Sequence, residues 1–262
     1  MEYMEKGGIG SFVALGDSFT EGLNDYAQDG TLIGWADRLA EVLATQVAGF
    51  RYANLAIRGK LVREVLHEQI EPAIAMSPDL VSVAAGGNDI LRGSDVDVLA
   101  ELFESGVARL QAAGCRVLIF TGFDPRAFPV IRLLRGRIAA YDMHLRAIAD
   151  QQGCDLVDLW SMRVLRDPRA WSGDRLHLTA DGHRLVALRA CEALGLPVGE
   201  DWRTPLPGNG QYPQAGRLAA RRDDLRWARE HAVPWVTRRV RGRSSGDNLP
   251  PKRPELEPVQ AS

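Results

Sequence analysis

The sequence lacks the features that would assign it to several specialised classes. It has only three cysteines, Cys115, Cys154 and Cys191, and their spacing fits neither a disulfide framework nor a metal site. No apolar run is long enough to span a membrane, and residues 1–10 lack the apolar core of a secretory signal. The formal net charge of −2 gives no general attraction to nucleic acid or to a membrane surface. We therefore expect a cytoplasmic protein with no nucleic-acid partner and no membrane span.

Short apolar runs alternate with amphipathic stretches over the first two thirds of the chain. The runs predict strands, and apolar residues at helical spacing predict helices between them. The expected strands are 12–15, 50–54, 79–85, 116–121 and 155–159, and the expected helices are 34–48, 61–75, 95–113, 137–152 and 180–194. This order predicts an α/β fold, in which a mostly parallel five-stranded sheet lies between two helical layers as a three-layer α/β/α domain.

A serine follows the first predicted strand. Gly16 ends the apolar run, and Ser18 comes two residues later. Open α/β sheets bind ligands beyond the carboxyl ends of their strands, which is where Ser18 should lie. A serine hydroxyl is a poor nucleophile without a neighbouring base, so Ser18 alone could equally be a helix N-cap. The groups around it must decide between these interpretations.

Three further segments bring polar groups to the same edge of the predicted sheet. Gly59 follows the second strand and opens a helix, so its backbone N–H can donate to an anion. Asn88 follows the third strand and offers a side-chain amide. Asp174 and His177 are three residues apart before the last helix, so one turn can bring the carboxylate to the imidazole, as a serine–histidine–aspartate mechanism requires. The alternative is a capping aspartate and a surface histidine.

The order of these segments resembles that of the SGNH or GDSL-type serine hydrolases, over about residues 11–195. The matching positions are Gly16-Asp17-Ser18, Gly59, Gly86-Gly87-Asn88-Asp89 and Asp174 to His177. The resemblance implies a flavodoxin-like fold and a serine esterase that hydrolyses small carboxylic (acyl or acetyl) esters through an acyl-enzyme. It also implies that no metal or organic cofactor is needed.

The resemblance further implies a role for each matching residue. Ser18 would be the nucleophile, His177 the base and Asp174 the residue that orients it. The backbone N–H groups of Ser18 and Gly59, with the Asn88 amide, would form the oxyanion hole. Two other functions remain open: an acyltransferase that moves an acyl group to a sugar or alcohol, and a non-catalytic ligand-binding module. The intact Ser18, Asp174 and His177 argue against the binding module.

Other residues near these segments have less specific interpretations. Residues 122–136 form an apolar loop after the fourth strand, and Phe123, Phe128 and Ile131 could line a substrate pocket or simply pack. We expect Asp17 and Asp89 to be hydrogen-bond acceptors that brace loops. His183 is expected to be a solvated residue of the last helix.

The composition changes after residue 195, which divides the chain into four regions. We expect a flexible amino terminus at 1–10, a hydrolase domain at 11–197, an arginine-rich helical extension at 198–246 and a disordered, proline-rich tail at 247–262. All the chemical groups discussed above precede residue 195. We therefore expect catalysis not to depend on the tail.

Overall fold

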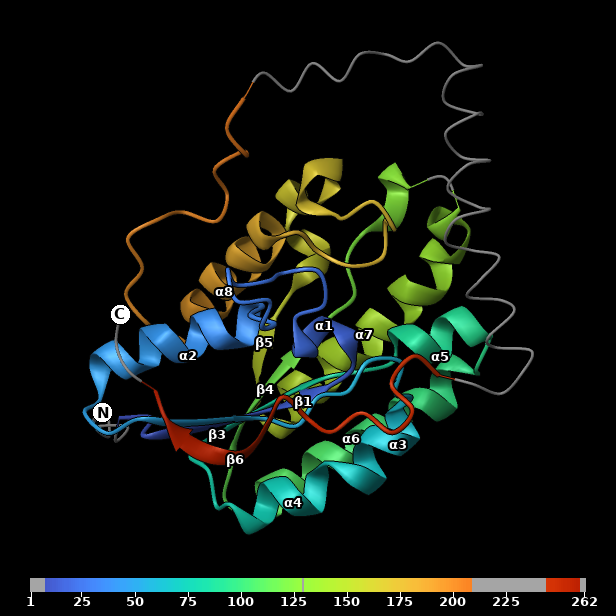
Figure 1. Cartoon of the computed structure of the whole chain (residues 1–262). Helices are drawn as coiled ribbons and strands as arrows, with labels where there is room; N and C mark the ends of the chain where they lie inside the picture. The colour runs from blue at the N-terminus through green and yellow to red at the C-terminus, as the bar shows by residue number, and fades with distance from the viewer. Residues whose placement is uncertain (1–7, 129, 209–243, 260–262) are drawn as a thin grey trace, which may run out of the picture.

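The structure, a computed structural model, describes residues 8–128, 130–208 and 244–259. A six-stranded sheet in the order β5-β4-β3-β1-β2-β6 forms its centre (Figure 1). β1 (Ser11–Gly16), β2 (Arg51–Asn54), β3 (Leu80–Ala84), β4 (Arg116–Phe120) and β5 (Asp155–Val157) run parallel. β6 (Arg253–Pro258) is antiparallel to β2 at one edge. The five predicted strands and the fold class are confirmed, and β6 is an additional strand.

Helices cover both faces of the sheet (Figure 1). One face packs against α2 (Trp35–Gln46) and α8 (Ala180–Leu194). The other packs against α3 (Val62–Glu68), α4 (Ile70–Ala75), α6 (Val96–Ala112) and α7 (Arg135–Gln152). The sequence of β1 is continuously apolar because both faces of the strand are buried. Phe12 and Ala14 face the first helical layer, whereas Val13 and Leu15 face the second.

Short helical elements follow several strands and were not predicted. α1 (Ser18–Glu21) begins directly after β1, and α5 (Gly87–Arg92) follows β3. Short 3-10 helices follow β4 and β5: η1 (Pro125–Ala127), η2 (Ile131–Leu134), η3 (Leu159–Ser161), η4 (Arg163–Arg166) and η5 (Pro168–Ala170). These elements give the carboxyl ends of the strands a defined backbone geometry.

The helix predicted over 61–75 is interrupted at Gln69, where α3 ends and α4 begins. The buried Gln69 side chain reaches the end of β1. Its Oε1 accepts from the Gly16 N–H at 2.8 Å, and its Nε2 donates to the Gly16 carbonyl at 2.9 Å. The break therefore satisfies the last polar backbone groups of β1, two residues before Ser18.

The predicted disorder of residues 247–262 is wrong for β6. This strand pairs with β2 in the register Arg51↔Pro258, Tyr52↔Glu257 and Asn54↔Arg253. An edge strand needs hydrogen bonds on one side only, so it can contain prolines.

The predicted domain end at 197 also needs correction, because Trp202 and Leu206 are buried in the core beside α8. Most of the expected helical extension, residues 209–243, lies outside the described residues, as do residues 1–7 and 260–262.

The cysteines and the helices agree with the composition of the chain. Cys115 and Cys191 are buried, Cys154 is half-buried, and none forms a disulfide. Within the described ranges, no helix combines the length and the apolar character that crossing a membrane requires.

Candidate active site

Ser18 occupies the first position of α1, immediately beyond β1. Asp17, not Ser18, is the N-cap of this helix, and its Oδ1 accepts from the Phe19 N–H at 3.1 Å. The Ser18 hydroxyl therefore has no capping role. It lies instead in a cleft of about 550 Å³ whose lining also includes Gly59, Asn88, Asp174 and His177.

A chain of hydrogen bonds joins Ser18, His177 and Asp174. His177 Nε2 lies 2.9 Å from Ser18 Oγ, and His177 Nδ1 lies 2.7 Å from Asp174 Oδ2. Because a carboxylate can only accept, Nδ1 carries a proton and Nε2 is left to accept from the serine hydroxyl. This is the arrangement in which an imidazole can remove the serine proton.

Several other donors hold Asp174 in place. Its Oδ1 accepts from the Ser172 hydroxyl at 2.6 Å and from the backbone N–H groups of Leu176 and His177 at 2.9 and 3.0 Å. The Asn24 amide donates to Oδ2 at 3.0 Å and to the Ser172 hydroxyl at 2.8 Å. Burial opposes ionisation, but the hydrogen bond and charge of His177, with the bond from Ser172, outweigh it and lower the pKa of Asp174. Asp174 is therefore ionised.

Asn24 was missed in the sequence, because it lies 150 residues before Asp174 in the chain. It belongs to a segment that the apolar pattern predicts only as a loop. Its partners become visible only in three dimensions. The Asn24 backbone has a φ of 73°, a conformation that asparagine tolerates better than most residues.

Gly59 is carried by a loop that an ion pair fixes. Arg58 pairs with the buried Glu21, with Nη2 2.6 Å from Oε1, and its backbone N–H donates to Glu21 Oε2 at 3.0 Å. Glu21 belongs to α1, the helix that begins at Ser18. The segment that carries Gly59 is thus bonded to the helix that carries Ser18.

Asn88 lies in the first turn of α5, and its amide already has two acceptors. Nδ2 donates to Asp17 Oδ2 at 2.9 Å and to the Lys60 carbonyl at 3.1 Å. An Asn amide has two hydrogens. Binding of an oxyanion by Asn88 therefore requires it to share or give up one of these contacts.

Asp17 and Asp89 are hydrogen-bond acceptors, as predicted, and their donors lie at the starts of helices. Asp89 Oδ2 accepts from the Val62 N–H at the start of α3, at 3.1 Å. Burial raises the pKa of Asp17 to about 6, against the opposing effects of the Phe19 N–H and the charge of His177. Burial likewise raises the pKa of Asp89. Asp17 thus carries a raised pKa beside Ser18 and Asn88.

The loop after β4 forms the apolar part of the cleft. Phe123 and Ile131 line it, as expected. Phe128 lies behind this wall, and its ring packs at 5.9 Å from that of Phe123 and 5.4 Å from that of Trp171. Of the two interpretations left open for Phe128, packing is the one observed, because the loop turns its ring into the core.

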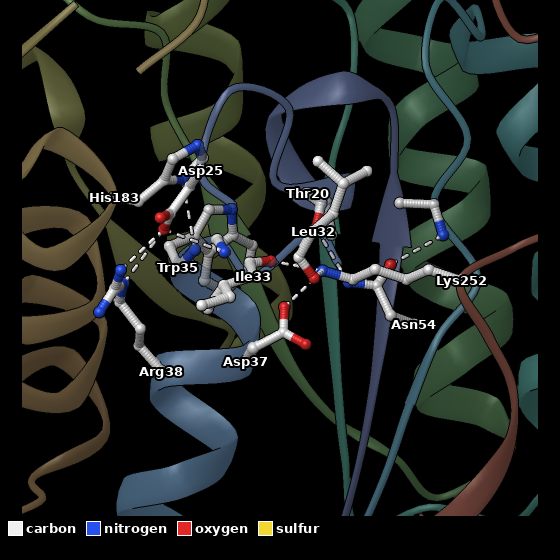
Figure 2. Close-up of polar contacts among 12 residues, drawn as sticks. Thr20, Asp25, Leu32, Ile33, Trp35, Asp37, Arg38, Asn54, His183 and Lys252 are labelled. Atoms are coloured by element: carbon white, nitrogen blue, oxygen red, sulfur yellow. Dashed lines mark hydrogen bonds and ion pairs between the residues drawn. The ribbon is translucent and has the colours of Figure 1, made fainter. Parts of the chain in front are cut away.

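His183 is buried, contrary to the prediction of a solvated residue. It is 1% exposed, and its Nδ1 accepts from the Trp35 N–H at 3.2 Å (Figure 2). Its Nε2 lies 3.4 Å from the Leu23 carbonyl. Burial lowers the pKa of His183 from 6.5 to about 4, although Asp25 opposes this. His183 therefore supports the 23–34 loop, which carries Asn24, as a neutral side chain.

The 23–34 loop is closed by two glycines in direct contact. Gly22 and Gly34 have φ angles of 89° and 98°, and a Cβ at Gly34 would lie 2.5 Å from the Gly22 Cα. Only glycine at both positions permits this approach. Asp25 Oδ2 reinforces it by accepting from the Gly34 N–H at 3.2 Å and pairing with Arg38 at 2.8 Å (Figure 2).

In the described part of the chain, no group of three or more His, Cys, Asp and Glu side chains is arranged to hold a metal ion.

Comparison with known proteins identifies related sequences and folds. A family model described as the GDSL-like Lipase/Acylhydrolase family matches residues 14–185. The acetylxylan esterase Axe2 of Geobacillus stearothermophilus has a similar structure, with a TM-score of 0.59 and 22% identity over 73% of this chain and 95% of that one.

Two further solved structures are similar to the same degree. TesA has a TM-score of 0.58 and 23% identity, over 70% of this chain and 97% of that one. LAE5, an alpha/beta hydrolase enzyme from the metagenome of Lake Arreo, Spain, has a TM-score of 0.57 and 23% identity, over 71% and 95% of the two chains. At these identities the likeness is one of fold. A search of curated proteins finds no match.

Proposed function

The chain belongs to the GDSL-like lipase/acylhydrolase family of carboxylic ester hydrolases, and we propose that it cleaves small esters through an acyl-enzyme on Ser18. The observation that carries this proposal is the continuous hydrogen-bonded chain from Ser18 through His177 to Asp174. A capping serine or a surface histidine would have no need of this geometry.

In the proposed first step, Ser18 Oγ attacks the ester carbonyl while His177 Nε2 takes its proton. The imidazolium formed in this way is stabilised by the ionised Asp174, 2.7 Å from Nδ1. His177 then gives the proton to the oxygen of the departing alcohol, which leaves the acyl group on Ser18. In the second half, His177 takes a proton from water as the water attacks the acyl-serine. His177 then returns this proton to Ser18 Oγ as the bond to the acyl carbon breaks, which releases the carboxylic acid and restores the free enzyme.

The negative charge that develops on the carbonyl oxygen would be bound by three donors. These are the backbone N–H groups of Ser18 and Gly59 and the amide of Asn88, all of which belong to residues lining the same cleft. Asn88 would release or share its contact with the Lys60 carbonyl when it binds the oxyanion. Each such donor supplies typically about 3 kcal/mol of transition-state stabilisation.

Turnover of p-nitrophenyl esters of graded acyl length, together with acetylated xylo-oligosaccharides, tests this proposal. Ser18→Ala should fold normally and lose nearly all turnover, and a fluorophosphonate should label the wild type at Ser18 alone. Ser105→Ala, at an exposed position of α6, is the matched control and should behave as wild type. An active Ser18→Ala protein, or labelling of another serine, would contradict the mechanism.

The same assay separates hydrolysis from acyl transfer. With an added alcohol or sugar, a hydrolase releases the free acid, whereas an acyltransferase yields the new ester. We expect the free acid to be the main product.

A further inference from the structure

The cleft receives part of its lining from the carboxyl-terminal end of the chain. Ser244 and Ser245 line it together with Ser18 and Gly59. We call residues 244–246 the wall segment. It comes from a region without any of the family's motif residues, and the family model ends at residue 185.

The wall segment lies in direct contact with the loop that carries Gly59. Gly59 has a φ of 78°, and a Cβ at this position would lie 2.2 Å from Ser244 Oγ. In the same way, a Cβ on the buried Gly246 would lie 2.1 Å from the Arg58 carbonyl. The close atom is the Ser244 side chain at Gly59 and the Arg58 backbone at Gly246, so a Cβ at either glycine would clash. The wall segment is therefore packed on the proposed oxyanion hole.

Lys252 anchors the chain that follows the wall segment. Its ammonium group bonds to the carbonyls of Leu32 and Ile33 and lies 2.5 Å from Asp37 Oδ2 (Figure 2). The Lys252 side chain is only 14% exposed and that of Asp37 17%. β6, which follows Lys252 in the chain, pairs with β2 and provides a second anchor. The chain that follows the wall segment is thus held against both the 23–34 loop and the sheet.

The order of the strands places different surfaces at the two ends of the cleft. β1, which leads to Ser18, has β2 and β6 on one side and β3 and β4 on the other. Phe123 and Ile131 follow β4 and make the end on that side apolar. On the β2 side, the wall segment presents the hydroxyl groups of Ser244 and Ser245. An ester bound at Ser18 would therefore meet an apolar surface on one side and hydroxyl groups on the other.

We propose that Ser244 and Ser245 select esters that carry a hydroxylated group on one side of the ester bond, and that Lys252 positions them. This inference rests on the proposed function, because it concerns the substrate of the same site. The preferred substrate class is an ester with an apolar group toward Phe123 and a polyol, sugar or hydroxy-acid group toward the wall segment. A substrate hydroxyl that enters the cleft gives up contacts with water and needs a hydrogen-bonding partner, which the half-buried Ser244 and the exposed Ser245 supply.

Two matched pairs of esters test the proposal with the full-length protein. Glycerol monobutyrate and propyl butyrate differ only in the hydroxyl groups of the alcohol, and p-nitrophenyl 3-hydroxybutyrate and p-nitrophenyl butyrate differ only in that of the acid. The wild type should have a higher kcat/KM for the hydroxylated member of at least one pair. The double variant Ser244→Ala/Ser245→Ala should reduce this preference about fivefold to tenfold, as the loss of one or two hydrogen bonds does. Ser105→Ala/Ser161→Ala, which changes two exposed serines elsewhere, should keep it.

Lys252→Met tests the positioning role. It should lower the Tm and also reduce the preference for the hydroxylated ester, because the wall segment loses an anchor. Arg109→Met, which breaks the exposed ion pair with Glu71, is the control and should leave the preference unchanged. A lower Tm with an unchanged preference would overturn the role of Lys252.

A preference that is absent from both pairs in the wild type, or unchanged in the double serine variant, would overturn the proposal as a whole. Binding of the same esters to Ser18→Ala, measured by calorimetry, gives a readout that needs no turnover. If Ser18→Ala still hydrolyses esters, the acyl-enzyme proposal fails, whereas the effect of the wall serines on the kcat/KM preference of the wild type continues to test the present inference.

Discussion

Acidification should destabilise this protein through one buried imidazole, that of His183. Its Nδ1 accepts a hydrogen bond from the Trp35 N–H, and a protonated ring could not do so. Protonation would also place a charge in the core, on a side chain that is 1% exposed. The perturbation we consider is a fall in pH from 7 to 4, compared between the wild type and His183→Asn. Asparagine can still accept from the Trp35 N–H but cannot gain a proton in this range.

The pKa of His183 sets the size of the effect. Burial lowers this pKa from 6.5 to about 4. A folded-state pKa below the unfolded value means that the unfolded chain binds the proton more tightly, so the stabilisation is present above pH 6.5 and is lost as the pH falls toward 4. The difference corresponds to about 3 kcal/mol of unfolding free energy, which is a large part of the stability of a typical domain.

Urea unfolding at several pH values measures this contribution. At pH 7 the variant should be less stable than the wild type, because it loses the contact with the Leu23 carbonyl and leaves a small void. As the pH falls from 7 to 4, the unfolding free energy of the wild type should decrease by about 3 kcal/mol more than that of the variant. Three aspartates, Asp17, Asp37 and Asp142, have raised pKa values, so the stability that they provide at low pH is lost as the pH rises. Both proteins contain these aspartates, so their effect cancels when the two unfolding free energies are subtracted. Two curves that stay parallel from pH 7 to 4 would refute the assignment of a neutral, buried His183.

Three further predictions concern catalysis. Asn88→Ala should lower kcat by about 10² to 10³ with little change in KM, because it removes one oxyanion donor; a loss expressed only in KM would assign Asn88 to substrate binding instead. The acid limb of kcat/KM against pH should be steeper than a single ionisation allows, because His177 must be neutral and because the ionised Asp17, whose pKa is about 6, accepts from the Asn88 amide more strongly than the protonated acid does. Asp17→Asn should restore a limiting slope of one, and equal slopes in the two proteins would exclude this role. Asn24→Ala should lower kcat about tenfold without loss of fluorophosphonate labelling at saturation, since it removes a donor to Asp174 but leaves Ser18 and His177 intact.

The sheet and its helices could be predicted because their signals are local. The alternation of Phe12 and Val13 between two cores needs only the backbone geometry of a strand, and α8 was predicted over the residues that form it. The groups of the candidate site were also predictable, because Ser18, Gly59 and Asn88 each follow a strand that belongs to the parallel sheet. Residues that follow the carboxyl ends of parallel strands lie at the same edge of the sheet, independently of the conformation of the loops.

The errors arise where a residue's environment depends on distant parts of the chain. His183 occupies a helix position that looks solvated, but the Trp35 backbone and the 23–34 loop cover it. Phe128 sits in an apolar loop whose turn geometry decides which rings face the cleft. β6 follows a region rich in proline and charge, and its formation depends on an open edge of β2 and on the site that Asp37 provides for Lys252. The composition of a short segment does not reveal such contacts with distant parts of the chain.

The antiparallel strand at the end of the sheet has a consequence for contacts between copies of the protein. Without it, β2 would present a row of unsatisfied N–H and C=O groups, a template onto which a strand of another molecule could add. β6 satisfies those groups, and its own outer edge is a poor template, because Pro254 and Pro258 have no N–H to donate and Glu255 and Glu257 are exposed and charged. Growth of the sheet at this edge therefore ends within the molecule, and removal of β6 would expose β2 as a nucleation site for edge-to-edge aggregation.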